Sequence, residues 1–150
     1  MELRPLTERD YPLLRELEEQ EDVWESVGAL PTPEEGGAQR LFVITEGAAA
    51  LGVGGLVPSR ALGEDDVEVF CALRSEAQLQ GNATRACELI IAWAFSVAKL
   101  DRVVASIDDA NETARTVAVK LGMKPLRPLA SGRTVYVRTR NEPAPDGVTR

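Results

Sequence analysis

The chain has 150 residues, of which 44% are hydrophobic and 27% charged, and it carries a formal net charge of −7 at pH 7. This length and composition are typical of a single globular domain with an apolar core. The sequence contains no histidine, which excludes histidine-ligated zinc sites and the Ser-His-Asp and Cys-His types of catalysis. The acidic balance argues against a nucleic-acid partner, because nucleic-acid binding requires a basic face.

No stretch of the sequence reaches the length of an uncharged membrane span, and the N-terminal residues lack the apolar segment of an export signal. We therefore expect a cytoplasmic protein with no membrane partner. The two cysteines, Cys71 and Cys87, do not have the spacing of a metal site. We interpret both as reduced core residues and expect no metal.

The N-terminal region predicts a strand followed by a helix. Residues 2–6 alternate like a short edge strand. The helix begins at Thr7 or at Asp10, and Asp10 is the better N-cap because Pro12 then lies in the first turn, where its missing N–H costs nothing. The buried side of this helix is expected to consist of Leu13, Leu14 and Leu17.

A loop and a hairpin are expected next. The acidic residues 16–22 are interpreted as a solvated face, and the Pro- and Gly-rich residues 31–37 predict a loop. Residues 40–46 and 50–57 predict a hairpin around Gly47. The glycines in its second strand favour close packing or a bulge.

A strand, a loop and a helix in the middle of the chain form the unit on which the functional interpretation depends. An acidic turn at residues 64–66 precedes the apolar residues 67–73, whose Val and Phe content predicts a strand. A polar loop over residues 74–80 leads to Gly81, where a long helix with one apolar stripe begins. A helix N-terminus just past a strand directs unpaired N–H groups and the positive end of the helix dipole to one point. A phosphate group suits such a point.

The C-terminal region predicts two further strands with a helix between them. Residues 102–107 form a second β-branched run, and residues 134–138 form the last clear strand. Between them, Asn111 opens a helix that ends in Lys-Leu-Gly-Met at residues 120–123.

The chain is expected to end in a tail. Residues 141–150 contain prolines and no apolar cluster, so we expect them to be disordered after a single folded domain over residues 1–140. One mixed sheet with helices packed on both faces accounts for the predicted elements and places the domain among the α/β folds.

Two motifs resemble the GCN5-related N-acetyltransferase (GNAT) superfamily. The loop pattern Gln78-x-x-Gly81-x-Ala83 is similar to the pyrophosphate loop with which this family binds coenzyme A. The helix opened by Asn111 is similar to the segment after the family's fifth strand, with Met123 in place of the usual aromatic residue. The resemblance implies the GNAT fold, with one central, mixed and mostly antiparallel sheet and helices on both faces. It also implies an N-acetyltransferase that uses acetyl-CoA.

The resemblance further implies that acetyl-CoA binds where the strands at 67–73 and 102–107 splay apart. Asn111 would face the pantetheine arm, and a strand amide near Leu73 would donate a hydrogen bond to the oxyanion of the tetrahedral intermediate. The pyrophosphate would rest on the loop and the first helical turn, at Leu79, Gln80, Gly81, Asn82, Ala83 and Thr84.

Arginines near this site are candidates for contact with the phosphates of coenzyme A. For Arg85, in the first turn of the helix, phosphate contact is slightly favoured over exposure. For Arg115 a solvated helix face is favoured, and for Arg74 both interpretations stay open. The elements after the first helix usually line the acceptor pocket in this family, so Trp24 and Leu30 are candidates for substrate contact.

Glu68 is our candidate for the group that takes a proton from the attacking amine, directly or through water. It lies early in the central strand, at a position where many family members carry a Glu. The alternative, that Glu68 is solvated beside the acidic residues 64–66, stays open. Cys71 is interpreted as a core residue, because direct attack by the amine needs no nucleophilic cysteine and no cation flanks it closely in sequence.

Three positions depart from the family pattern. Ala118 stands where many members have a Tyr that protonates the departing thiolate. Ala114 stands where one branch has a Ser near coenzyme A, and Leu79 where a glycine is frequent. These departures leave the fold prediction intact and weaken the prediction of activity.

Two classes of function follow. The favoured one is an acetyl-CoA-dependent N-acetyltransferase that transfers the acetyl group directly to a primary amine of a small molecule or a protein N-terminus. The alternative is a non-catalytic GNAT-fold module that binds acyl-CoA or a protein partner. A phosphate binder for another nucleotide is disfavoured, since nothing else in the chain resembles a base or ribose site. The sequence leaves open the acceptor and the oligomeric state, for which a homodimer is one option.

Overall fold

The computed structural model describes residues 1–20, 40–78 and 81–140. In these residues, one seven-stranded sheet carries three α-helices and two short 3₁₀ turns. The elements in chain order are β1 (Glu2–Pro5), η1 (Glu8–Asp10), α1 (Tyr11–Glu19), β2 (Arg40–Glu46), β3 (Ala49–Ser59), β4 (Asp66–Leu73), η2 (Ser75–Ala77), α3 (Asn82–Ser96), β5 (Arg102–Asp108), α4 (Glu112–Lys120), β6 (Lys124–Leu129) and β7 (Arg133–Thr139). No helix in this part of the chain is long and apolar enough to cross a membrane.

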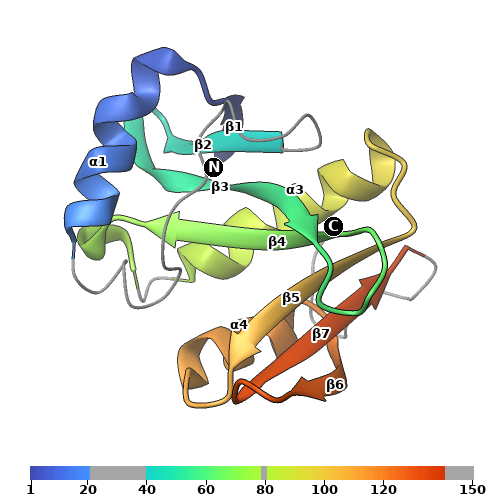
Figure 1. Cartoon of the computed structure of the whole chain (residues 1–150). Coiled ribbons are helices and arrows are strands. Elements are labelled where there is room, and N and C mark those ends of the chain that lie inside the picture. Colours follow the sequence, from blue (N-terminus) through green and yellow to red (C-terminus); the bar gives the residue numbers. More distant parts are fainter. Residues whose placement is uncertain (21–39, 79–80, 141–150) are drawn as a thin grey trace.

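The sheet has the strand order β1-β2-β3-β4-β5-β7-β6 (Figure 1). Neighbouring strands are antiparallel except β4 and β5, which run parallel and are connected through α3. Parallel neighbours need such a crossover connection, because a tight turn cannot join them. The mixed, mostly antiparallel sheet that the resemblance implies is confirmed.

Helices cover both faces of the sheet. Consecutive residues of a strand point to opposite faces. On β2, Val43 packs with Leu17 of α1, whereas the next residue, Ile44, packs with Ala86 of α3. Ala118 of α4 belongs to the same core as α3, so α4 shares the face of α3. In the view of Figure 1, α3 passes behind the sheet.

The main core lies between the sheet and α3. Its buried members come from β3, β4, α3, β5, α4 with the residues just after it, and β7, and include Leu56, Val69, Ile90, Ile91, Ala94, Val103, Leu121 and Tyr136. The predicted stripe of α3 is buried at Ala86, Cys87, Ile90 and Ala94. Val97, just past the last helical residue, is 61% exposed.

The start of the first helix combines both predicted positions. The turn η1 follows Thr7, and α1 follows Asp10 with Pro12 in its first turn. The side chain of Asp10 does not cap α1, however. It instead accepts hydrogen bonds from Arg4 of β1 at 2.9 and 3.1 Å and from the Thr7 N–H at 2.9 Å. The predicted buried residues of this helix are confirmed at Leu13, Leu14 and Leu17.

The glycine-rich strand β3 packs closely against β4. A Cβ atom on Gly52 would lie 2.1 Å from the carbonyl oxygen of Ala72, so only glycine fits there. The β2–β3 pairing also shifts register between Ile44 and Thr45. Both the close packing and the bulge expected from the glycines are present, and the hairpin turns at Gly47 with a φ of 61°.

The structure contains one strand that the sequence analysis missed. We predicted a single strand after α4, but β6 and β7 form a hairpin that turns at Gly132, whose φ is 80°. Pro125 and Pro128 obscured the strand pattern of β6. Proline is tolerated in a strand at the edge of a sheet, and β6 is such an edge strand.

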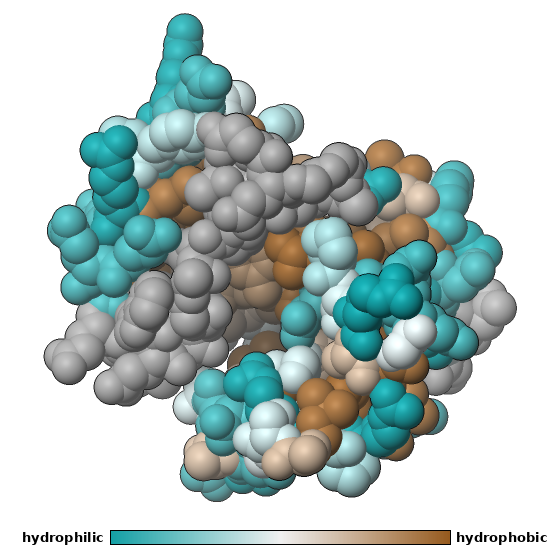
Figure 2. Space-filling model, in the orientation of Figure 1, coloured by the Kyte–Doolittle hydropathy of each residue, from teal (hydrophilic) through white to brown (hydrophobic). Residues whose placement is uncertain are grey.

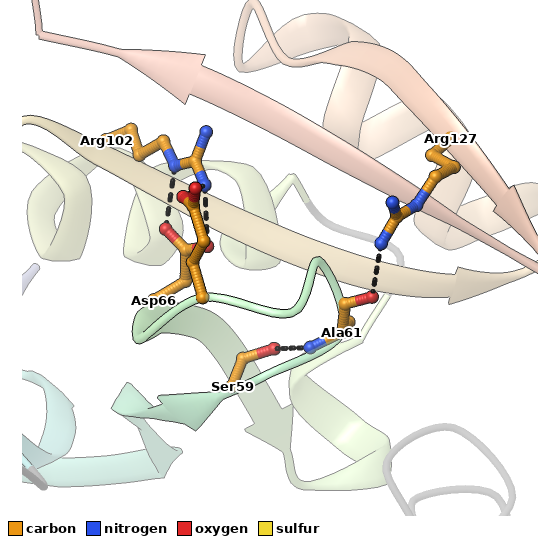
Figure 3. A network of polar contacts seen from close by, with 6 residues as sticks. Ser59, Ala61, Asp66, Arg102 and Arg127 are labelled. Carbon is orange, nitrogen blue, oxygen red and sulfur yellow. Dashed lines mark hydrogen bonds and ion pairs between the residues drawn. The ribbon is translucent and has the colours of Figure 1, made fainter.

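The acidic turn before β4 is tied to the strands beside it (Figure 3). Arg102 of β5 binds both Glu64 and Asp66, and Arg127 of β6 donates to the carbonyl oxygen of Ala61 at 2.9 Å. The turn lies at residues 61–64, slightly earlier than the predicted 64–66, because Asp66 already belongs to β4. Its acids are not all solvated, since the side chain of Asp66 is only 6% exposed.

Candidate functional site

The strands β4 and β5 touch at one position and then separate. Their backbones pair at Glu68 and Val104 alone, although β4 continues to Leu73 and β5 to Asp108. Figure 1 shows the two strands diverging beyond this point. The same view in space-filling form has a recess with apolar surface between them (Figure 2). An opening thus exists where the sequence placed the acetyl-CoA cleft.

Backbone groups of β4 face this opening. The N–H of Arg74 donates to the Leu51 carbonyl at 2.8 Å, on the β3 side. Because successive residues of a strand alternate the side to which their backbone groups point, the N–H and C=O of Leu73 point toward β5. The Leu73 carbonyl accepts a hydrogen bond from Gln78 Nε2 at 3.0 Å. This bond fixes the start of the loop that leads to α3.

The N-terminus of α3 lies at the end of the same loop. Gly81 precedes the helix in the left-handed region, with a φ of 74°, and a Cβ there would meet nothing within 4 Å. The glycine is therefore needed for its backbone angle rather than for space inside the protein. Asn82 Nδ2 donates to the Ala77 carbonyl at 2.9 Å, which closes the loop. The first turn of α3 includes Asn82, Ala83 and Thr84. The N-terminus of a helix can bind an anion through its backbone N–H groups and its dipole.

Glu68 lies at the apex of the opening and is half-buried rather than solvated. Its Oε1 accepts a hydrogen bond of 2.5 Å from the N–H of Ser106 on β5. Burial raises the pKa of the Glu68 carboxyl, while the Ser106 N–H and the positive charge of Arg133 act in the opposite direction without cancelling it. A carboxylate with a raised pKa is better matched to proton transfer near neutral pH than an ordinary Glu.

Asn111 immediately precedes α4 and caps it. Its Oδ1 accepts a hydrogen bond from the Ala114 N–H at 3.1 Å. The carbonyl half of this side chain is therefore used by the helix, and the Nδ2 half remains as a donor for a ligand.

A sequence model of the family described as "Acetyltransferase (GNAT) domain" matches residues 1–124. The chain belongs to the GNAT acetyltransferase family. Members of this family are N-acetyltransferases that use acetyl-CoA. No curated protein sequence is significantly similar to the chain.

Solved structures support the fold of this GNAT domain. An acetyltransferase from Agrobacterium tumefaciens matches with a TM-score of 0.72 at 22% identity, over 92% of this chain and 90% of that one. A spermidine N-acetyltransferase from Vibrio cholerae, in complex with CoA and spermine, matches with a TM-score of 0.73 at 16% identity, over 91% and 92%. An aminoglycoside acetyltransferase in complex with coenzyme A matches with a TM-score of 0.74 at 19% identity, over 92% and 94%.

Two candidate arginines of this GNAT domain have carboxylate partners. Arg74 binds Glu16 of α1, with Nε 2.6 Å from Oε2. Arg85 binds Glu46 at 3.2 Å and also donates to the Asn82 side chain. A phosphate would have to compete with these carboxylates for either arginine.

Arg115, unlike Arg74 and Arg85, has no ion pair with a carboxylate among the described residues. Its Nε is shielded from solvent and has no hydrogen-bond partner in the described part of the chain. The solvated helix face that the sequence favoured for this residue is thus wrong for its Nε. A shielded N–H donor that lacks a partner is unfavourable, so a ligand acceptor would stabilise it.

Ala118 and Cys71 behave as core residues of this GNAT domain. Ala118 is 2% exposed and offers no hydroxyl in place of the family's tyrosine. A hydrogen bond with Cys87 and burial both raise the pKa of the Cys71 thiol, so the thiol stays protonated and is unsuited to nucleophilic attack.

Sequence reasoning missed Ser106 and Arg133 as residues of the site. Arg133 Nε donates to Ser106 Oγ at 3.0 Å, and its Nη2 donates to the Ser106 carbonyl. A serine within an otherwise apolar strand was the one available signal. Of the predicted residues, Leu79, Gln80, Trp24 and Leu30 lie outside the described residues, as do the predicted loop at 31–37 and the predicted tail.

Proposed function

We propose that this GNAT domain transfers the acetyl group of acetyl-CoA directly to a primary amine, of a small molecule or of a protein N-terminus, and that Glu68 accepts the proton. The observation that carries the proposal is the half-buried Glu68 carboxylate at the apex of the opening between β4 and β5. The position is where an amine and a thioester would meet if coenzyme A enters along β4 from the loop before α3.

Coenzyme A would be bound by groups from both sides of the opening. Its pyrophosphate would rest on the amides of residues 79–84, as the left-handed Gly81 and the helix N-terminus that follows it support. The Nδ2 of Asn111 would donate to the pantetheine arm. Arg74, Arg85 and Arg115 are the cations that could pair with its phosphates. Arg115 favours this role most clearly, because among the described residues it has no carboxylate partner and its shielded Nε has no hydrogen bond.

The reaction would need no covalent enzyme intermediate. The neutral amine attacks the thioester carbonyl, and the Leu73 N–H donates a hydrogen bond to the oxyanion. The C–S bond then breaks, coenzyme A leaves as its thiolate, and the proton of the attacking nitrogen passes to Glu68. Oxyanion donors contribute roughly 10²–10³ in rate and a general base roughly 10²–10⁴.

Small, cationic or neutral amines are the acceptors to test first. The chain carries a net charge of −7, which disfavours anionic acceptors. The similar structures include a spermidine N-acetyltransferase and an aminoglycoside acetyltransferase. We therefore include a small-molecule amine as the acceptor in the proposal.

A second candidate function is a GNAT-fold module that binds acyl-CoA or a protein partner without catalysis. Ala118 favours it, because the buried alanine cannot protonate the leaving thiolate. Coenzyme A thiolate is a fair leaving group without such an acid, so the loss of this group slows the reaction rather than preventing it.

Calorimetric titration with acetyl-CoA is the first test. Gly81→Asp should abolish binding, because the new carboxylate would occupy the pyrophosphate site and repel the pyrophosphate. Gly63→Asp is the matched control, since Gly63 also has a positive φ and open space around its Cβ but lies in the β3–β4 turn. Micromolar binding that only Gly81→Asp removes would support the site, and no binding by the wild type would overturn both candidate functions.

An amine panel then separates the two functions. Glu68→Gln should lower kcat/KM by at least about 10² without weakening acetyl-CoA binding. Glu112→Gln, at an exposed glutamate on α4, serves as the charge control and should leave kcat/KM unchanged. Acetyl-CoA binding with no transfer to any amine in the panel would favour the non-catalytic module.

A further inference from the structure

We propose that Ser106 and Arg133 are positioning residues for the Glu68 carboxylate at the apex of the opening. The inference deepens the proposed function, on which its catalytic consequence rests. It adds two residues to the site, which lie on β5 and β7 and belong to neither of the two sequence motifs.

The three residues come from three strands and share one face of the sheet. On β5, Ala105 and Ile107 pack in the core with α3, so Ser106 between them points to the opposite face. On β4, Phe70 packs against the α1 core, which places Glu68, two residues earlier, on that same opposite face. Arg133 of β7 pairs with Asp108, two residues beyond Ser106.

Glu68 replaces a missing strand partner. In a continuous parallel ladder the Ser106 N–H would donate to a carbonyl of β4. Beyond the pair of Glu68 and Val104, β4 is too far away to supply one. The carboxylate of Glu68 accepts this N–H instead. The divergence of the strands thus leaves the Ser106 N–H available, and this N–H orients the Glu68 carboxylate.

Arg133 fixes the other side of Ser106. Its Nε and Nη2 bind the Ser106 hydroxyl and carbonyl together, which is the two-point geometry that a guanidinium provides. Its charge also acts on Glu68, where it opposes the effect of burial. Loss of Arg133 would leave the carboxylate both less firmly held and less readily ionised.

Other charged groups near Glu68 in the described residues are already paired. Asp66 and Glu64, on the β4 side, bind Arg102 of β5. Asp109, next to the end of β5, accepts a hydrogen bond from Thr134 at 2.6 Å. Asp108 accepts from the Ala110 N–H at 2.9 Å. Arg133 is the cation that acts on Glu68 among the described residues.

The test measures the titration of Glu68 itself by NMR of protein labelled with ¹³C at the glutamate carboxyl groups. Glu68→Gln assigns the signal by its disappearance. In Arg133→Gln the Glu68 pKa should rise above that of the wild type. Arg133→Lys keeps the charge, so its Glu68 pKa should lie close to that of the wild type. Arg127→Gln, which removes an exposed arginine from β6, should leave the Glu68 pKa unchanged.

Activity provides the second readout. In Arg133→Gln the acid limb of the pH profile of kcat/KM should move to higher pH together with the Glu68 titration, with acetyl-CoA affinity within about twofold of the wild type. Arg133→Lys should keep the position of the limb but lose several-fold in kcat, because an ammonium cannot bind Ser106 at two points.

The outcomes separate this inference from the proposed function. A Glu68 titration that is the same in the wild type and in folded Arg133→Gln would overturn the positioning role. If Arg133→Gln fails to fold, an Arg133→Lys protein with wild-type kcat would overturn it equally. A shifted Glu68 titration in a protein that acetylates no amine would sustain the positioning role and contradict only the proposed catalysis.

Discussion

Arg102 of β5 holds Asp66 of β4 through two hydrogen bonds, from Nε to Oδ1 at 2.7 Å and from Nη2 to Oδ2 at 2.8 Å. This pair joins the two strands at their N-terminal ends, whereas the opening lies at their C-terminal ends. The two strands are therefore held together at their N-terminal ends and diverge toward their C-terminal ends. The bidentate geometry and the small exposure of Asp66 make this pair stronger than an ordinary surface ion pair.

Asp66→Asn should lower the free energy of unfolding by about 1–3 kcal/mol, because Arg102 then loses a charged partner at a partly buried position. Asp65→Asn is the matched control. Asp65 is 89% exposed and pairs with Arg60, so its loss should cost less than about 1 kcal/mol. Urea denaturation measures both, and equal losses in the two variants would contradict the role assigned to Asp66.

Gly52→Ala should destabilise the protein by about 2 kcal/mol or more, since its Cβ would overlap the backbone of β4 and force the strands apart. Gly47→Ala removes a glycine with a φ of 61° and open surroundings. It should cost only the strain of a left-handed alanine, about 1 kcal/mol. Urea denaturation curves give the comparison, and a larger loss for Gly47→Ala would refute the close approach of β3 and β4.

Substitutions at Asn111 separate its cap from its proposed ligand contact. Asn111→Ala should lose about 0.5–2 kcal/mol of stability, whereas Asn111→Ser keeps a capping oxygen and should stay near the wild type. Both should weaken acetyl-CoA binding several-fold if Nδ2 donates to the pantetheine arm. Thermal unfolding and calorimetric titration measure the two effects. Wild-type affinity in Asn111→Ala would limit the residue to capping.

Asp10 should contribute stability that depends on pH. Hydrogen bonds from Arg4 and from Thr7 lower the pKa of Asp10 against the effect of burial. A carboxyl whose pKa is lower in the folded state stabilises the protein above its unfolded pKa, about 3.9, and loses that contribution as the pH falls through the folded value. The wild type should therefore exceed Asp10→Asn in melting temperature at pH 6, and the gap should close toward pH 2. A gap that does not change with pH would exclude this ionic contribution.

Local patterns predicted the central unit well. The run of Val and Phe before a polar loop and Gly81 placed β4 and α3, because a buried strand and a glycine with a positive φ each leave a local signal. The GNAT family also followed from the loop motif together with the helix that Asn111 opens. These features depend on residues close in sequence.

Features that depend on distant partners could not be predicted. Arg74 meets Glu16 and Arg85 meets Glu46 only because the sheet brings α1 and β2 beside the loop. Ser106 and Arg133 joined the site only because β4 diverges from β5 and leaves an N–H for Glu68. No residue type at these positions encodes the point at which two strands part.

The prolines of the edge strand β6 have a consequence for assembly. Pro125 and Pro128 have no N–H, so this border of the sheet is a poor template for a strand from another molecule. Partially unfolded copies are thereby hindered from joining edge to edge into aggregates. A homodimer of this chain would be expected to associate through side chains rather than by extending the sheet across β6.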